Sequence, residues 1–169
     1  MTDHPQPNWQ DSLQPGDIVA FRFPHKDKSG AAPKTRPTLV LAKAKVADQT
    51  FVALAYGTTK IKKRRTAYHI PVTSEEERKV AGLDRPTVFD GARRIVVAAE
   101  NSNFSVRRDI GSPVIGRLTC GSLHRMFAVS ATIRAHQRKR RDQFGRLKLG
   151  RPSSHQSRSM LKPEEASHV

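Results

Sequence analysis

The 169-residue sequence has one cysteine, few aromatic residues and few acidic residues. A single cysteine, Cys120, cannot form an intramolecular disulfide or a cysteine-based zinc site, which favours a reducing compartment. No apolar run approaches the roughly 20 residues that span a bilayer, and the polar segment 1–9 lacks the apolar core of a signal peptide. We therefore expect a cytoplasmic protein that does not cross a membrane.

The shortage of acidic residues leaves a formal net charge of +16, from 31 lysines and arginines against 15 aspartates and glutamates. Such a charge favours a polyanionic partner, either nucleic acid or an anionic membrane surface. The sequence offers no basic amphipathic helix, which argues against the membrane surface. The length fits one domain of ordinary size and a tail.

Runs of β-forming residues between turn signals predict a mostly β protein. Residues 1–14 are expected to be a flexible lead-in, and residues 15–136 a single domain. Six strands are expected in this domain, at 17–23, 38–46, 50–56, 66–72, 94–99 and 113–118. Residues 47–49 are read as a hairpin turn, and residues 74–80 as a short helix.

A longer helix is predicted at the end of this domain. Its apolar stripe consists of Leu123, Met126, Phe127, Ser130 and Ile133, which recur at helical spacing. Short strands followed by one closing helix predict a small half-open β-barrel rather than alternating βαβ units. Residues 137–169 are rich in Lys, Arg and Ser, and we expect a basic, disordered tail there.

The predicted barrel contains an ordered set of short motifs. In chain order they are Pro15-Gly16-Asp17-Ile18-Val19, Phe23-Pro24, Arg36-Pro37-Thr38-Leu39-Val40-Leu41, Ala55-Tyr56-Gly57-Thr58-Thr59-Lys60 and Ile115-Gly116-Arg117-Leu118. This set resembles the PemK/MazF family of toxins from bacterial type II toxin–antitoxin systems, over about residues 15–135. The resemblance implies an SH3-like α+β barrel closed by a C-terminal helix, a homodimer, metal-independent cleavage of single-stranded RNA, and a cognate antitoxin protein as partner.

By the same resemblance, the arginine of the family's Arg-Pro pair is Arg36 and the catalytic threonine is Thr58. Metal-free cleavage uses the 2′-hydroxyl of the RNA as nucleophile, so the enzyme must move two protons and stabilise charge on the phosphorane. Arg36 can hold two phosphate oxygens, whereas an arginine is a poor general base because its guanidinium stays protonated. Thr58 offers a hydroxyl donor, and its neighbour Thr59 offers the same group.

Other residues are weaker candidates. His25 lies in the loop after the first strand, where it can meet a phosphate, although a solvated loop histidine is the commoner case. Asp84 and Asp90 can orient a base or an arginine, or simply form turns. Tyr56 and Phe104 can stack on bases or belong to the core. No pair of residues has metal-ligand spacing, so we expect no metal and no cofactor.

The densest basic cluster follows Thr59 directly. It is read either as an RNA-phosphate site or as a solvated hairpin tip, and its members are Lys60, Lys62, Lys63, Arg64 and Arg65.

A non-catalytic barrel that binds RNA or DNA is the alternative function. Its support is the charge, together with departures from the family pattern. Residues 24–35 contain one acidic residue, Asp27, whereas many relatives carry a glutamate shortly before the Arg-Pro pair. This departure leaves the general base unassigned.

Overall fold

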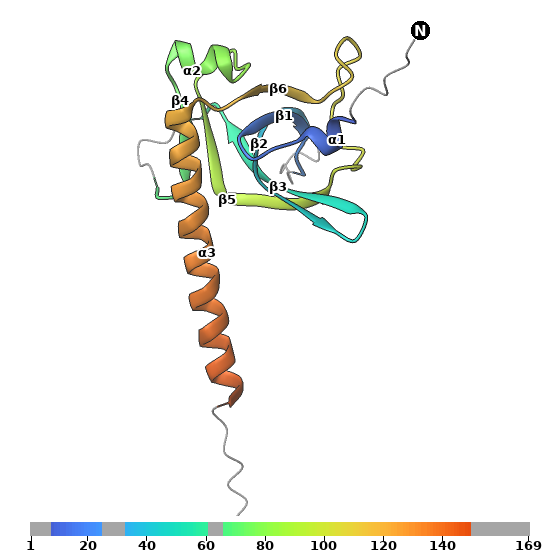
Figure 1. Ribbon diagram of the computed structural model, residues 1–169. Helices are drawn as coiled ribbons and strands as arrows, with labels where there is room; N and C mark the ends of the chain where they lie inside the picture. The colour runs from blue at the N-terminus through green and yellow to red at the C-terminus, as the bar shows by residue number, and fades with distance from the viewer. Residues whose placement is uncertain (1–7, 25–32, 61–65, 150–169) are drawn as a thin grey trace, which may run out of the picture. The chain divides into compact units, whose positions relative to one another are not determined.

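The computed structural model of the protein describes residues 8–24, 33–60 and 66–149 (Figure 1). Contacts along the chain divide it into two units, Met1–His136 and Gln137–Val169. The first unit contains the described strands, and the second contains the end of a long helix. None of the helices in the described ranges has the length and apolar character needed to cross a membrane.

One antiparallel sheet dominates the first unit. The elements in chain order are α1 (Trp9–Ser12), β1 (Asp17–Arg22), β2 (Thr35–Val46), β3 (Gln49–Thr58), β4 (His69–Val72), α2 (Glu75–Val80), β5 (Thr87–Ala98), β6 (Val114–Arg117) and α3 (Cys120–Leu149). The strands lie in the order β4-β5-β3-β2-β1-β6, and each neighbouring pair is antiparallel. The sheet curls into a half-open barrel (Figure 1). This confirms the mostly β class, while the SH3-like topology stays a prediction.

The β2–β3 hairpin turns where the sequence predicted. Val46 pairs with Gln49, so Ala47 and Asp48 form the loop, and Ala47 takes a left-handed φ of 53°. Both strands extend beyond the expected ranges, because β2 begins at Thr35 and β3 ends at Thr58. β5 also begins earlier than expected, at Thr87 rather than at residue 94.

One face of the sheet packs against the first part of α3. Met126, Val129 and Ile133 of α3 are buried in a cluster with strand residues such as Leu39 and Phe89. The predicted stripe was wrong at Phe127, which is half exposed. Val129 continues the i, i+3, i+7 series that begins at Met126, whereas Phe127 lies a further 100° or so around the helix.

The opposite face is covered by the N-terminal segment and by the connection between β5 and β6. The Phe104 ring lies 5.1 Å from that of Trp9 and 4.8 Å from that of Phe21, and Leu13 is fully buried. The expected loose lead-in is therefore incorrect for residues 9–13. A helical turn at Trp9–Ser12 lets Leu13 bury its whole side chain and Trp9 part of its own, which offsets the entropy of ordering the segment.

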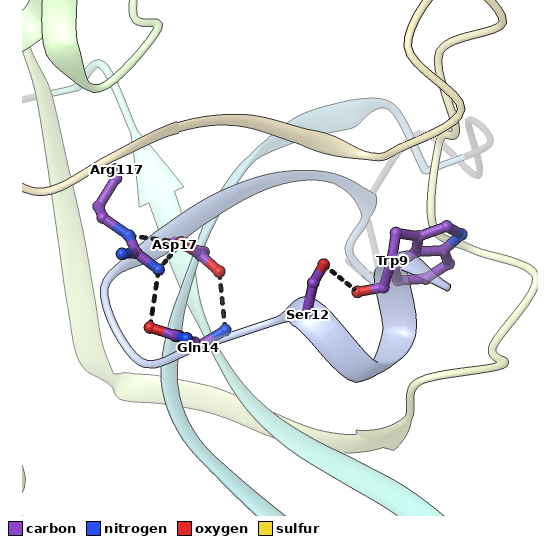
Figure 2. A network of polar contacts seen from close by, with 5 residues as sticks. All are labelled: Trp9, Ser12, Gln14, Asp17 and Arg117. Carbon is purple, nitrogen blue, oxygen red and sulfur yellow. Dashed lines mark hydrogen bonds and ion pairs between the residues drawn. The ribbon is translucent and has the colours of Figure 1, made fainter. Parts of the chain in front are cut away.

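A polar network joins the N-terminal segment to β1 and β6 (Figure 2). The Asp17 carboxylate accepts hydrogen bonds from the main-chain N–H of Gln14 at 2.7 Å and from Nε of Arg117 at 2.8 Å. Nη2 of Arg117 also donates to Oε1 of Gln14 at 3.2 Å. These bonds fix β6 beside β1 at the edge of the sheet (Figure 2).

The second unit begins inside α3, which continues to Leu149. We expected disorder from residue 137, and this was wrong for residues 137–149. Lys, Arg, Gln and Leu are good helix formers, and extending an existing helix is far easier than nucleating one. Residues 150–169 lie outside the described ranges.

Candidate functional site

Arg36 lies at the start of β2 and Thr58 at the end of β3. The last pair of the β2–β3 ladder at this end is Thr38 with Tyr56, and continuing the same antiparallel register by two residues would bring Arg36 opposite Thr58. Residues two apart on a strand point to the same face, so both side chains lie on the face that Tyr56 occupies. Directly opposed residues have Cβ atoms about 5 Å apart. The extended register thus makes the two proposed catalytic residues cross-strand neighbours.

A β-bulge at Leu41 decides which threonine faces Arg36. On the turn side of the bulge, Ala42 pairs with Ala53; beyond it, Val40 pairs with Leu54, and Leu41 has no counterpart on β3. An unbroken ladder would place Thr59 opposite Arg36. The extra residue shifts the register by one, so the continued register brings Thr58, not Thr59, opposite Arg36.

Gly57 lets the two strands approach closely at this point. A Cβ atom at Gly57 would lie 2.2 Å from the main-chain oxygen of Pro37 and 3.0 Å from the ring of Phe89. No side chain fits between these groups. The glycine therefore keeps Arg36 and Thr58 within reach of each other.

Tyr56 supports the arginine. The guanidinium carbon of Arg36 lies 5.8 Å from the centroid of the Tyr56 ring, and Phe23 packs edge-on against the same ring at 5.2 Å. Arg36 is half-buried, and it stands next to Phe21 of β1 in the sheet. A cation over an aromatic face gains about 0.5–2 kcal/mol, depending on its desolvation. The ring therefore restrains the guanidinium of Arg36 on this face of the sheet.

Tyr56 and Phe104 belong to the core. Tyr56 is 5% exposed and Phe104 is 7% exposed, and both are members of the cluster that includes Phe21. Of the two roles considered from the sequence, the core role is the one observed.

Thr58 is held by the turn that follows β3. Its Oγ1 accepts a hydrogen bond from the main-chain N–H of Lys60 at 3.1 Å. This contact fixes the hydroxyl oxygen while leaving its O–H proton to donate. Thr59 follows the strand and is exposed, as is Lys60.

A three-residue bulge in β5 adds an arginine that sequence reasoning missed. Asp90 pairs with Tyr56 and Arg94 pairs with Ala55, so Gly91, Ala92 and Arg93 form a bulge between these two pairs of the ladder. Within this β5 bulge, the guanidinium carbon of Arg93 lies 4.0 Å from the Tyr56 ring centroid. Two guanidinium groups therefore contact one tyrosine ring.

The Asp90-Gly91 dipeptide was the available signal for this bulge, because Asp-Gly is typical of turns. The sequence analysis considered Asp90 alone, as an orienting or a turn-forming residue. Oδ1 of Asp90 accepts a hydrogen bond from the main-chain N–H of Ala92 at 2.9 Å, which is the turn-forming role considered from the sequence.

The remaining candidates are less connected to this site. Asp84 lies in the turn between α2 and β5, where its main-chain oxygen accepts a hydrogen bond from Arg78 at 3.0 Å. His25 and the cluster members Lys62, Lys63, Arg64 and Arg65 lie outside the described residues. Their roles, like those of Arg36, Thr58, Thr59 and Lys60, stay predictions.

Comparison with known proteins points to one family. A family model described as PemK-like, MazF-like toxin of type II toxin-antitoxin system matches residues 14–106, which is more than half of the chain. A search of curated proteins finds no match. The matched segment includes Arg36, Thr58 and the β5 bulge. Membership of such a system implies an antitoxin partner. The chain therefore belongs to the family of PemK-like, MazF-like toxins, as the order of its sequence motifs predicted.

Proposed function

We propose that this protein is an endoribonuclease that cleaves single-stranded RNA without a metal ion, with Arg36 and Thr58 in its active site. The observation that supports the proposal is the register of β2 and β3, which, continued two residues past the Thr38–Tyr56 pair, would bring Arg36 opposite Thr58. The family match supports the class of activity. The net charge of +16 supports a polyanionic substrate.

The reaction begins with the 2′-hydroxyl of a ribose. It loses its proton, and its oxygen attacks the adjacent phosphorus to form a pentavalent phosphorane. The bond from phosphorus to the 5′-oxygen then breaks, and that oxygen takes up a proton. The products are a 2′,3′-cyclic phosphate and a 5′-hydroxyl end.

Arg36 and Thr58 stabilise the negative charge that grows on the non-bridging oxygens. The guanidinium of Arg36 donates two N–H groups in a fixed fork, which suits two phosphate oxygens. The Thr58 hydroxyl donates a further hydrogen bond from the opposite strand. Both donors are held before substrate arrives, by Tyr56 and by the N–H of Lys60 respectively, so little reorganisation is needed during the reaction.

The proposed partners are single-stranded RNA as substrate and a cognate antitoxin as inhibitor. A homodimer and a cytoplasmic location are part of the same proposal, and both rest on the family resemblance.

The test uses purified protein, a single-stranded RNA and excess EDTA. We expect cleavage that leaves 2′,3′-cyclic phosphate ends. Arg36→Ala and Thr58→Val each remove a donor to the phosphorane, and the loss of one such donor typically lowers kcat by about 10²–10³-fold. Thr59→Val is the matched control for the threonine. Arg134→Ala is the control for the arginine, because Arg134 is exposed on α3.

Three results would contradict the proposal: cleavage that requires a divalent metal, full activity of Arg36→Ala, or an equal loss in Thr58→Val and Thr59→Val. Salt-sensitive binding that leaves the RNA intact would instead favour the non-catalytic nucleic-acid-binding barrel.

A further inference from the structure

We propose that a basic segment of α3 binds duplex DNA, by lying in the major groove between the two phosphate backbones. The basic segment consists of residues 137–143, and its four cations are consecutive: Arg138, Lys139, Arg140 and Arg141. It lies outside residues 14–106, which match the family model, and outside the proposed active site. The inference therefore goes beyond the proposed ribonuclease function and does not depend on it.

The basic segment is exposed along its whole length. Residues 137–143 lie within the helix α3, and each of them is exposed. They belong to the second unit of the chain, whereas Ile133, in the first unit, is the last residue of α3 in the described core clusters. The basic segment is therefore helical without contributing to that core, and its cations are accessible to a partner.

Positive charge surrounds the helix in the basic segment. Successive residues of an α-helix are about 100° apart around its axis, so four consecutive cations span about 300° of the circumference. The one acidic residue of the segment is Asp142. Within the described part of the chain, no ion pair joins any of the four cations to an acidic side chain. This distribution favours a partner that places anions on more than one side of the helix.

The major groove of B-form DNA is such a partner. It is about 12 Å wide and admits an α-helix, which with its side chains is about 10–12 Å across. The phosphates of the two strands line the two edges of the groove, so cations on opposite sides of the helix can contact different strands. The basic segment is about 10 Å long, and a DNA duplex carries one negative charge for about every 1.7 Å of its axis. Several phosphates therefore lie within reach of its cations.

Other polyanions fit the basic segment less well. A single nucleic-acid strand and an anionic membrane surface each offer anions to one side of a helix, so cations on the far side would gain no partner. Duplex RNA has two strands, but the major groove of the A-form is deep and narrow. B-form DNA is therefore the partner that the charge distribution favours. Because the contacts are to phosphates, binding should depend steeply on salt and little on base sequence.

The experiment uses the full chain and two charge-matched variants. In the helix variant, glutamine, a good helix former, replaces each cation of the basic segment: Arg138→Gln, Lys139→Gln, Arg140→Gln and Arg141→Gln. In the surface variant, glutamine replaces four exposed cations outside α3: Lys45→Gln, Lys79→Gln, Arg85→Gln and Arg108→Gln. Circular dichroism reports the helix content of each variant.

Binding is measured over a range of salt concentrations to four probes. They are a short DNA duplex, an RNA duplex and a single-stranded 2′-O-methyl RNA of the same sequence, and phosphatidylserine vesicles. Cleavage of single-stranded RNA is measured separately in excess EDTA.

For the helix variant we expect the dissociation constant of the DNA duplex to rise at least about 30-fold at low salt. The slope of log K against log salt should fall by about 2–3, since each phosphate contact on B-form DNA contributes about 0.9. The surface variant has the same net charge and should raise the dissociation constant about threefold at most, because only screened, long-range attraction is lost. Binding to the other three probes, and RNA cleavage, should change no more in the helix variant than in the surface variant.

A third variant keeps the charge of the basic segment, by Arg138→Lys, Arg140→Lys and Arg141→Lys. It should bind the DNA duplex with the affinity and the salt slope of the parent protein, because phosphate contacts need a cation rather than a guanidinium group.

The inference is overturned if the helix variant loses no more affinity for the DNA duplex than the surface variant does. It is also overturned if the helix variant loses as much affinity for the RNA duplex, the single strand or the vesicles as for the DNA duplex, because the basic segment would then bind any polyanion. Failure of the ribonuclease proposal would look different, since the parent protein would leave RNA intact while still binding the DNA duplex through the basic segment.

Discussion

Replacing Asp17 by alanine removes the carboxylate at the centre of the network that joins β1 to β6. The Asp17 side chain is 7% exposed, whereas the Arg117 side chain that faces it is 51% exposed. In the variant, Arg117 can turn to water, but the main-chain N–H of Gln14 loses its acceptor. The expected effect is a loss of stability with little change at Arg36 and Thr58.

The size of that loss follows from the contacts. Hydrogen bonds to a charged group contribute about 1.5–3 kcal/mol each, and Asp17 accepts them from the N–H of Gln14 and from Arg117. Because water hydrates Arg117 in the variant, the stability lost is smaller than the sum of the two contributions. We expect Asp17→Ala to lower the free energy of unfolding by about 2–4 kcal/mol, and the melting temperature by about 6–14 °C for a domain of this size.

Urea denaturation followed by tryptophan fluorescence is the assay, since the sequence has one tryptophan, Trp9, and it packs against Phe104. Asp109→Ala is the matched control. Asp109 also pairs with an arginine, Arg107, but its side chain is 59% exposed, and exposed pairs contribute about 0–1 kcal/mol. The reasoning is refuted if Asp17→Ala and Asp109→Ala lower the free energy of unfolding equally.

Two further predictions concern the contacts of α2 and α3. The Glu77 carboxylate accepts hydrogen bonds, above all from the Ser122 hydroxyl at 2.7 Å, and these lower the pKa of Glu77 below that of an ordinary glutamate. The ionised form is therefore the one that stabilises the fold, so Glu77→Gln should be less stable than the parent at neutral pH. That difference should vanish as the pH falls through the lowered pKa; an equal difference at pH 7 and at pH 2, measured by urea denaturation, would contradict it. Ser130 has a buried Oγ with no hydrogen-bond partner among the described residues, so Ser130→Ala should leave stability unchanged or raise it by up to about 1 kcal/mol. A fall of 1 kcal/mol or more in the free energy of unfolding would show that the hydroxyl has a partner.

Much of the sheet could be predicted from the sequence, because a strand with one buried face alternates its residue types. The β2–β3 hairpin and its turn at Ala47 and Asp48 are clear in that pattern. The N-terminal helical turn at Trp9 could not be predicted from this pattern, because its stability comes from contact with Phe104, about a hundred residues away in the chain. Likewise, the helical pattern of α3 does not distinguish Phe127 from Val129 until the sheet is in place.

The site was predicted only in part, for a related reason. Motif order identified Arg36 and Thr58 as candidates, but the choice between Thr58 and Thr59 as the residue opposite Arg36 depends on the Leu41 bulge. Bulges arise from the competition between two paired strands and the core beneath them, so a single strand's sequence does not specify them. Arg93 was missed for the same reason, because its contact with Tyr56 depends on how β5 pairs with β3.

The β5 bulge also has an evolutionary consequence. Gly91, Ala92 and Arg93 stand outside the ladder, while pairing resumes on both sides of them. Gaining or losing a residue there would alter the reach of the guanidinium, yet it would leave the flanking registers intact. An insertion within a paired strand usually moves the side chains beyond it to the other face of the sheet. An insertion within the bulge would not, because pairing resumes on both sides of it. Variation in length at this one place would therefore change the segment beside Tyr56 while the barrel keeps its strand pairing.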